Sequence, residues 1–267
     1  MVALLLTPEI AAAQSTSPAA GGVEIADERG RREPLSLSAS AGIDYSRGEY
    51  GADEKTSLLV VPLSVRAGVG GLRVSATLPY LRIDSPGNVV SGGPGGPIIV
   101  DPNAPSTRDV RKGFGDLSLG AAYGIPFAGL DLDLSARVKL PTSARLKSLG
   151  TGKTDVAVRG ELSKSIGTWT PFASVGYRFL GDPTEVDLRN SVSTSVGTIK
   201  QLGSTVLVAS YDYARATTAA VDDAHELFAA VSGRLTDRVN LTTYGIAGLS
   251  EGSPEFGVGL LVTLKLR

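Results

Sequence analysis

Apolar and polar residues alternate along most of the chain. In the segment LSLSASAGIDYS, apolar residues occupy every second position from Leu35 to Tyr45, with Ser, Gly and Asp between them. The segment LDLDLSARVKL repeats the pattern from Leu130 to Leu140. Successive side chains of a β-strand point to opposite faces, so a period of two predicts strands with one apolar and one polar face.

Twelve segments of this kind follow one another, without a helical period of comparable length, and most are ten to fourteen residues long. Strands of globular proteins have a mode of about five or six residues, whereas a tilted strand that crosses a bilayer needs about nine to eleven. The pattern therefore predicts an all-β protein, a transmembrane antiparallel up-and-down β-barrel of about 12 strands. Segments 112–124 and 186–200 are the least regular, so ten or fourteen strands remain alternatives. The expected strands are 35–47, 56–67, 72–84, 112–124, 130–141, 154–166, 169–180, 186–200, 204–214, 225–236, 238–249 and 255–266.

The connections between these segments alternate in length. Short ones such as 68–71 and 201–203 take every second place, and most of the others, such as 85–111 and 142–153, are longer. Outer-membrane barrels join their strands by short periplasmic turns and longer outer loops in this order. We therefore expect a location in the bacterial outer membrane, with lipid as the surrounding partner and both ends of the barrel domain on the periplasmic side.

The aromatic residues of the apolar faces fall near the strand ends. Aromatic side chains with a polar edge settle at the headgroup level of a membrane, where they form two girdles. In a soluble barrel they would concentrate in the core instead. The predicted girdle residues are Tyr45, Tyr80, Tyr123, Trp169, Tyr177, Phe179, Tyr211 and Tyr213.

If the apolar faces meet lipid, the polar faces line the lumen. Charges of both signs are expected there, and they must be paired or wet, because an unpaired buried charge is costly. The interior then either supports the fold only, or forms a narrow conduit whose charges tune passage. The long loop 85–111 could fold inward as a constriction or cover the mouth of the barrel. The predicted lumen-lining residues are Asp133, Arg137, Arg159, Glu161, Arg178 and Arg234.

The residues before the first predicted strand differ from the rest of the chain in composition and lack the alternating pattern. Residues 1–13 combine a short apolar run with a small-residue triplet that suits a signal peptidase, and we interpret them as the remnant of an export signal. Residues 14–33 are rich in Ser, Ala, Gly and charge, which is typical of a flexible periplasmic lead-in. The barrel then comprises residues 34–267.

Composition excludes several other functions. The net charge is −1, so there is no electrostatic footprint for nucleic acid. The chain contains no Cys and one His, which argues against disulfides and against a zinc site. No run of 18 apolar residues occurs, so a membrane-spanning helix is not expected. We expect no metal and no cofactor.

The stretch LKSLGTGKTD, residues 146–155, resembles the end of a phosphate-binding loop. That motif also requires a glycine at the position of Lys147, and a helix directly after the loop. The residues that follow, TDVAVRGEL, alternate as a strand does. The stretch is therefore interpreted as a glycine turn with solvated lysines in an outer loop.

Three glycine-rich segments resemble a known family. They are GFGDLSLGAAYGIP (113–126), LGTGKTDVAVRGELSKSIG (149–167) and PFASVGYRFLGDP (171–183). They are similar to segments of the outer-membrane barrels associated with phenol meta-cleavage degradation pathways, and the likeness covers the second half of the chain from Gly113. The resemblance implies passage of hydrophobic or aromatic compounds across the outer membrane. It carries over no binding residues.

Three functions follow as expectations. The first is a non-enzymatic channel for passive uptake of small hydrophobic or aromatic molecules, and the second is a structural or surface-interaction barrel without transport. The third is a barrel hydrolase that uses His225 with Asp222, Asp223 and Glu226. It is disfavoured because parity places His225 on the lipid side and Glu226 inside, and because the sequence shows no partner serine.

The last segment, EFGVGLLVTLKLR, carries a further expectation. Apolar residues alternate along it from Phe256 to Leu266, as in the assembly signals of outer-membrane barrels, although the chain closes on Arg267 and not on an aromatic residue. We therefore expect this strand to engage the barrel-assembly machinery.

Overall fold

The structure is a computed structural model of the whole chain. It describes residues 35–50, 54–86, 107–143, 149–181, 188–219 and 221–267, together with four short strands outside these ranges. Those strands form two small hairpin-like pairs. β1 (Leu4–Leu5) pairs with β2 (Glu24–Ile25), and β6 (Val89–Ser91) pairs with β7 (Pro97–Ile99). The rest of the predicted leader and lead-in, and most of the predicted constriction loop, lie outside the described residues.

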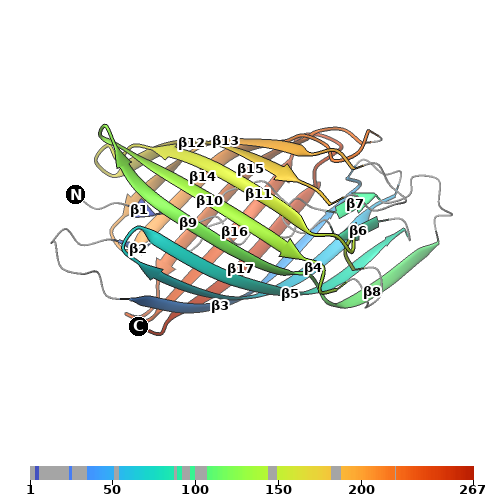
Figure 1. Cartoon of the computed structure of the whole chain (residues 1–267), viewed down its shortest axis with the longest axis horizontal. Helices are drawn as coiled ribbons and strands as arrows, with labels where there is room; N and C mark the ends of the chain where they lie inside the picture. The colour runs from blue at the N-terminus through green and yellow to red at the C-terminus, as the bar shows by residue number, and fades with distance from the viewer. Residues whose placement is uncertain are drawn as a thin grey trace.

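The remaining strands form one closed antiparallel barrel (Figure 1). Each strand pairs with its neighbours in the chain, and β17 returns to pair with β3, from Phe256 opposite Arg47 to Lys265 opposite Ser38. β8 and β9 together form one stave, so the barrel has twelve staves, as predicted. The strands are β3 (Ser36–Gly48), β4 (Thr56–Val69), β5 (Leu72–Pro86), β8 (Arg108–Phe114), β9 (Leu117–Phe127), β10 (Leu130–Leu140), β11 (Asp155–Ser163), β12 (Trp169–Phe179), β13 (Ser191–Leu202), β14 (Thr205–Ala214), β15 (Ala224–Arg234), β16 (Val239–Gly248) and β17 (Phe256–Lys265).

The two ends of the barrel differ as the connection lengths predicted. Tight turns close one end, and β9 passes into β10 through Ala128 and Gly129, which both have positive φ. Two such residues give a turn whose twist matches that of the strands. The longer connections lie at the opposite end, and β3 begins and β17 ends at the end with the tight turns (Figure 1).

A bulge divides the stave formed by β8 and β9. Phe114 pairs with Tyr80, and Ser118 pairs with Thr77, so the β8–β9 side holds one residue more than β5 between these pairs. The extra residue turns the buried Asp116 toward the interior. This bulge explains why the segment 112–124 looked irregular in the sequence, and why the alternation changes phase within it.

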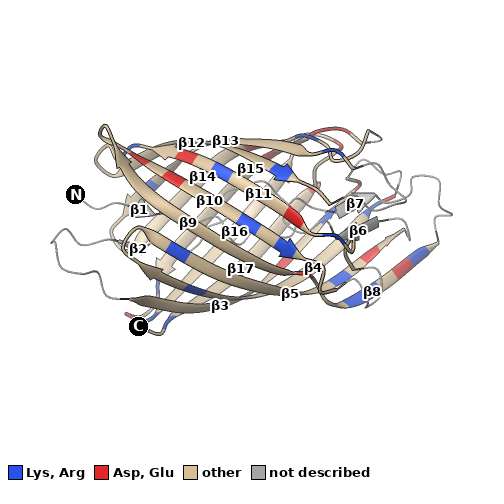
Figure 2. Ribbon diagram, in the orientation of Figure 1, with Lys and Arg blue, Asp and Glu red and all other residues tan. Residues whose placement is uncertain are grey.

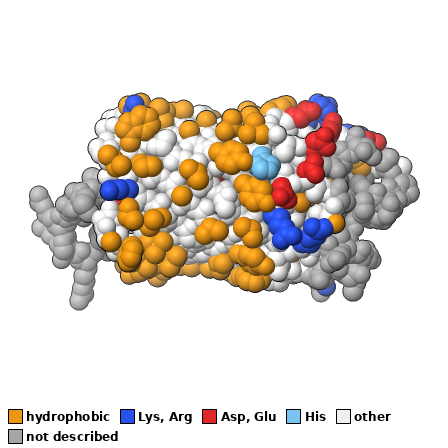
Figure 3. All heavy atoms as spheres, turned by 90° about the horizontal axis from the view of Figure 1, so that it is seen from above, with side chains coloured by type: hydrophobic (Ala, Val, Ile, Leu, Met, Phe, Trp, Pro, Cys, Tyr) orange, Lys and Arg blue, Asp and Glu red, His pale blue; other side chains and the backbone are white. Residues whose placement is uncertain are grey.

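The outer surface is apolar around the middle of the barrel. Figure 3 shows hydrophobic side chains over the visible face, with charged side chains gathered toward one end. Lipid-facing residues such as Val175, Val196 and Val258 are more than half exposed. The twelve-strand count, the strand lengths and this outer surface agree with the predicted transmembrane barrel. The described residues contain no helix that is long and apolar enough to cross a membrane.

Candidate functional site: the barrel interior

A charged wall covers one part of the interior. Arg73 on β5 forms an ion pair with Asp133 on β10, and Arg159 Nη2 on β11 lies 3.3 Å from Glu161 Oε2 on the same strand. All four side chains are largely buried. Figure 2 shows acidic and basic residues along β10 and β11. Because the charges are paired, their mutual attraction offsets part of the free energy that their burial costs.

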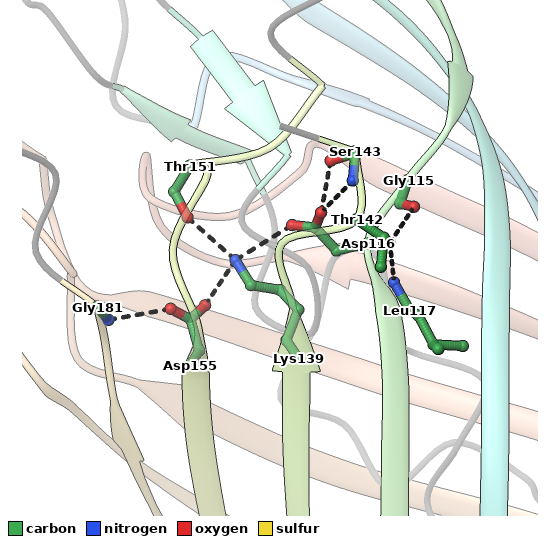
Figure 4. A network of polar contacts seen from close by, with 9 residues as sticks. All are labelled: Gly115, Asp116, Leu117, Lys139, Thr142, Ser143, Thr151, Asp155 and Gly181. Carbon is green, nitrogen blue, oxygen red and sulfur yellow. Dashed lines mark hydrogen bonds and ion pairs between the residues drawn. The ribbon is translucent and has the colours of Figure 1, made fainter. Parts of the chain in front are cut away.

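A buried lysine organises the end of this wall toward the longer loops (Figure 4). Lys139 Nζ lies 2.9 Å from Asp155 Oδ2 and 3.5 Å from Asp116 Oδ2, and it donates a hydrogen bond of 3.1 Å to Thr151 Oγ1. The backbone N–H and the hydroxyl of Ser143 both donate to Asp116 Oδ1. One ammonium thus bridges two carboxylates that are themselves hydrogen-bonded, which is the arrangement that buried charges require.

The three glycine-rich segments meet at this lysine. Asp116 belongs to the first segment, Thr151 and Asp155 to the second, and Gly181 of the third donates its N–H to Asp155 Oδ1 at 3.1 Å. Residues of all three glycine-rich segments therefore belong to one network of polar contacts around Lys139, although none of the segments contains Lys139 itself.

The stretch that resembles a phosphate loop is part of the same network. Gly150 is packed so closely that a Cβ there would lie 2.6 Å from Asp116 Oδ2. The stretch leads into β11, a strand, where a phosphate loop requires a helix. Residues 149–154 form an irregular connection without a helix, and Gly150 packs against a carboxylate of the chain itself where a phosphate loop would hold a phosphate. Lys147 lies outside the described residues, and Lys153 is half-buried.

The predicted lumen residues differ in their surroundings. Asp133, Arg159 and Glu161 lie in the ion pairs of the charged wall. Arg178 on β12 is buried, and Arg137 on β10 is half-buried. Arg234 is exposed at the last position of β15, next to the tight turn that follows. The structure therefore shows ion pairs for Asp133, Arg159 and Glu161, and it places Arg234 at the rim of the barrel.

An apolar wall covers another part of the interior, and it was not predicted. Its residues alternate with the lipid-facing ones but are buried. They come from β12 to β17, so the cluster spans six neighbouring strands. The members of this apolar wall are Phe172, Ile199, Val206, Val208, Phe228, Ala230, Tyr244, Ile246 and Leu261.

A second apolar cluster lies on the inner faces of β4 and β5. Leu58 and Val60 of β4 pack with Leu81 and Ile83 of β5, and Leu149 joins them from the connection between β10 and β11. Leu149 is only 1% exposed. The signal for both apolar groups was present as runs without alternation, such as LLVV at 58–61 and TVLV at 205–208. In these runs both faces of the strand are apolar.

Asp44 on β3 lies between the two apolar groups. Along the pairing rows, Asp44 is opposite Gly259 of β17 on one side and Val60 of β4 on the other, and Gly259 is opposite Tyr244 of β16. Asp44 is 8% exposed, and within the described part of the chain neither of its carboxylate oxygens has a hydrogen-bond partner. Among the described residues, the apolar region of the interior therefore contains a carboxylate that has no hydrogen-bond partner.

The predicted girdle residues lie on the outer surface. Tyr123 and Trp169 are near the tight turns, and the other six lie toward the longer loops. Several contact a second aromatic ring, as Tyr45 does with Phe256 and Tyr80 with Phe114. Tyr45 and Tyr213 are half-buried, and the remaining exposed residues are Tyr80, Tyr123, Trp169, Tyr177, Phe179 and Tyr211.

His225 lies on the outer surface, as parity predicted, and Glu226 is buried inside. The hydroxyl of Tyr211 is 2.5 Å from His225 Nδ1, so a tyrosine contacts the ring. Ser250 and Ser253 are near His225, but their hydroxyls contact its backbone N–H, at 3.0 and 2.9 Å. In Figure 3 the histidine lies where apolar side chains give way to charged ones. Among the described residues, no serine hydroxyl is hydrogen-bonded to the imidazole.

No arrangement for a metal appears among the described residues, where no three His, Asp or Glu side chains are grouped to hold an ion. The interior thus offers ion pairs, apolar surface and isolated polar groups. Such surfaces can guide or bind small molecules, and the described residues show no assembled catalytic constellation.

Comparison with known proteins identifies no family. No family model matches the sequence, and no curated protein matches it. Solved structures of low similarity include the transport unit of the autotransporter AIDA-I from Escherichia coli, with 7% identity, a TM-score of 0.49, and coverage of 91% of this chain and 93% of that one. The CymD monoaromatic hydrocarbon channel shows 10% identity, a TM-score of 0.43 and 88% coverage of both chains. Outer membrane phospholipase A from Escherichia coli shows 13% identity, a TM-score of 0.41, and coverage of 85% and 95%. This likeness concerns the barrel architecture and carries no inference about function.

Proposed function

We propose that the chain is a non-enzymatic channel of the bacterial outer membrane, through which small hydrophobic or aromatic molecules cross by passive diffusion. The observation that carries the proposal is the apolar wall inside the barrel. Side chains such as Phe228 and Ile199 point away from the lipid, so they do not serve to anchor the barrel in the membrane. These side chains are 1–8% exposed and pack against one another beside the charged wall, so a solute that passes along them displaces apolar contacts, which favours molecules with an apolar body.

The electrostatics of the interior agree with this solute class. The ion pairs Arg73–Asp133 and Arg159–Glu161 combine opposite charges in direct contact. Such pairs cancel much of each other's field, so the wall does not select strongly for one sign of charge. The charged wall therefore favours neither anions nor cations, and the preference among solutes depends on the rest of the lining.

Transport through reconstituted protein tests the proposal. Purified protein in vesicles that contain lipopolysaccharide, which slows the passage of apolar solutes, is expected to accelerate the entry of toluene or phenol relative to protein-free vesicles of the same composition. A sugar of similar size is expected to enter these vesicles more slowly than toluene or phenol. The apolar wall is probed by the double variant Val206→Thr, Val208→Thr, which keeps side-chain size but adds two hydroxyl groups. This variant is expected to lower toluene entry several-fold, because apolar contact with the solute is lost.

A matched control uses the same change on the other face. Val231 of β15 faces lipid and pairs with Leu207, so Val231→Thr alters the neighbouring strand without touching the interior. It should leave toluene entry unchanged. If wild-type protein passes neither toluene nor phenol, the chain is a structural or surface-interaction barrel, and the channel function is wrong.

The hydrolase alternative has less support. His225 contacts Tyr211 through its ring, and the nearby hydroxyls of Ser250 and Ser253 also donate to the backbone carbonyls of Asp223 and His225. A serine that donates to a backbone carbonyl is not oriented toward a general base. Ester or phospholipid hydrolysis that His225→Gln abolishes would favour this alternative over the channel.

We also propose that β17 directs insertion through the barrel-assembly machinery, with lipid of the outer membrane as the final partner. This strand completes the ring by pairing with β16 and β3. Deletion of residues 256–267 would leave two unpaired edges inside a bilayer, where open edges are not tolerated. The deletion is expected to abolish heat-modifiable barrel in outer-membrane fractions, and its normal insertion would contradict this role.

A further inference from the structure

Asp44 is unusual among the acidic residues of the interior. Asp133 forms an ion pair with Arg73, Asp155 forms one with Lys139, and Asp212 accepts hydrogen bonds from Ser195 and Ser210. Asp44 has no hydrogen-bond partner within the described residues, although it is almost fully buried. A buried carboxylate without a partner lowers the stability of the fold, so its presence is better explained by a role other than stability.

The surroundings of Asp44 resemble a binding site. A Cβ at Gly259 would collide with both the carboxylate of Asp44 and the phenol of Tyr244, so these two polar groups converge over the glycine from the strands on either side. The Tyr244 ring belongs to the apolar wall and packs against Phe228, with ring centroids 5.7 Å apart. Val60 follows on the other side of Asp44. Apolar surface with a few convergent polar groups is the usual composition of a small-molecule site.

We propose that Asp44 and Tyr244 form a recognition site for the hydrogen-bond donor of a small aromatic solute, a hydroxyl or an ammonium group. The inference deepens the proposed function, on which it rests, by naming the solute class. The carboxylate accepts the hydrogen bond, the Tyr244 hydroxyl donates or accepts a second one, and the aromatic body lies on the apolar wall. A hydrocarbon without a donor would gain only the apolar contact.

Chemistry limits the solute to molecules with a donor. A carboxylate oxygen accepts hydrogen bonds and repels other anions, so a benzoate-like solute is disfavoured at Asp44. A hydrogen bond from the solute gives a partner to a carboxyl oxygen that has none among the described residues. Loss of such a bond corresponds to about a tenfold change in affinity.

Equilibrium binding to the full-length protein in detergent tests the site without requiring transport. Phenol, benzylammonium and toluene have similar apolar bodies, but toluene has no donor. Saturation-transfer NMR and titration calorimetry are expected to give tighter binding of phenol and benzylammonium than of toluene. Asp44→Leu should weaken binding of the two donors about tenfold and leave toluene unchanged.

Two further variants identify the donor. Asp44→Asn keeps a hydrogen-bond acceptor but removes the carboxylate. It should preserve much of the phenol binding, and benzylammonium should no longer bind more tightly than toluene. Tyr244→Phe keeps the ring in the apolar wall and removes only the hydroxyl, and it should weaken phenol binding to a smaller degree. Asp212→Asn is the matched control, because Asp212 is equally buried inside the barrel but already has two serine partners. It should leave all three affinities unchanged.

Folding is checked on the same variants. If Asp44 serves recognition, Asp44→Leu and Asp44→Asn should unfold at the same temperature as wild type or a higher one, because an isolated buried carboxylate is removed. A purely structural Asp44 would instead give less stable variants with unchanged relative affinities for phenol and toluene. That result overturns the inference.

Transport and binding separate the two proposals. If wild-type protein passes toluene and phenol but Asp44 variants bind donors normally, the channel stands and the recognition site is wrong. If wild-type protein passes no solute yet binds phenol in an Asp44-dependent manner, the site stands and the channel is wrong. If phenol binds no more tightly than toluene, the recognition site is rejected.

Discussion

Lys139 Nζ on β10 lies 2.9 Å from Asp155 Oδ2 on β11, and the two side chains are only 3% and 5% exposed. The ammonium also lies 3.5 Å from Asp116 Oδ2, so one cation faces two carboxylates at the bulge and the adjoining loop (Figure 4). Through its contacts with Asp116 and Thr151, Lys139 links the bulge between β8 and β9 to the connection between β10 and β11.

Replacement of Lys139 should destabilise the barrel. Lys139→Met leaves Asp116 and Asp155 without their shared cation, and breaking a buried ion pair from one side costs about 3–5 kcal/mol. The free energy of unfolding in urea, measured in lipid vesicles, is expected to fall by about that amount. Lys164→Met changes an exposed lysine in the turn between β11 and β12, and should have almost no effect.

A double-mutant cycle supplies the stricter test of this network. Asp155→Asn in the Lys139→Met background should cost less than the sum of the two single changes, because both remove the same ion pair. Additive losses would show that Lys139 and Asp155 do not stabilise each other.

Gly150→Ala is expected to disturb the same network for a steric reason. The new Cβ would lie 2.6 Å from Asp116 Oδ2 and 2.9 Å from Ser143 Oγ, which is closer than side chains pack. We expect a loss of about 1–3 kcal/mol in the free energy of unfolding, as for other overpacked positions. At Gly233, the nearest atom to an added Cβ is Thr205 Oγ1 at 4.0 Å, so Gly233→Ala is the matched control. Equal stability of both variants would contradict the packing at Gly150.

Asp223, in the connection before β15, gives the chain a local acid dependence. Its pKa is lowered from 3.8, first by the backbone N–H of Ala216 and then by the hydroxyl of Tyr213, which both donate to the carboxylate. A lowered pKa in the folded state contributes stability that is present above pH 3.8 and is lost as the pH falls through the lowered value.

NMR titration of the Asp223 carboxyl carbon is therefore expected to give a pKa below 3.8. Protection of the Ala216 amide from hydrogen exchange, corrected for intrinsic rates, should fall over the same acidic range. Asp223→Asn should remove this dependence, whereas Asp222→Asn, at the exposed neighbouring position, should retain it. An ordinary pKa for Asp223 would exclude the two hydrogen bonds.

Trp169 reports the depth of the barrel in a membrane, because it is the single tryptophan of the chain. Its side chain is 45% exposed at the start of β12, and Lys200 Nζ lies 4.3 Å from the ring centroid. An aromatic ring with a neighbouring cation is expected at the headgroup level. Lipids brominated near the headgroup should quench its fluorescence more than lipids brominated at the chain end. Strong quenching by the deeper bromines would place the ring in the hydrocarbon core.

Much of the fold could be read from the sequence because a barrel strand has a simple physical rule. Lipid on one side and the interior on the other impose a period of two, and the segment from Leu130 to Leu140 shows it over the full width of a membrane. Turn residues such as Gly129 then fix where each strand ends. The number of strands and the alternating loop lengths follow from these local signals.

Long-range contacts decided what the interior contains. The alternation rule assigns Phe228 and Val208 to an inner face, but it does not state that residues of six strands combine into one apolar wall. The glycine motifs around Asp116 and Asp155 are distinctive in the sequence, whereas Lys139, which contacts both carboxylates, has the pattern of an ordinary polar residue on a strand. The lack of a partner for Asp44 likewise depends on the pairing of β3 with β17 and β4, which the sequence does not show.

The sequence by itself determined the class of structure, the approximate positions of most strands and the side of each strand that meets lipid, because these depend on local periodicity and on the thickness of a bilayer. The irregular segments were placed less well: β8 begins at Arg108 and not at 112, and β13 begins at Ser191 and not at 186. The tertiary structure decided which inward side chains face each other, because strand register and the bulge at Asp116 set these distances across the barrel. A shift of one residue reverses every side chain of a strand, so the charged wall, the apolar wall and the position of Asp44 depend on the closed ring as a whole.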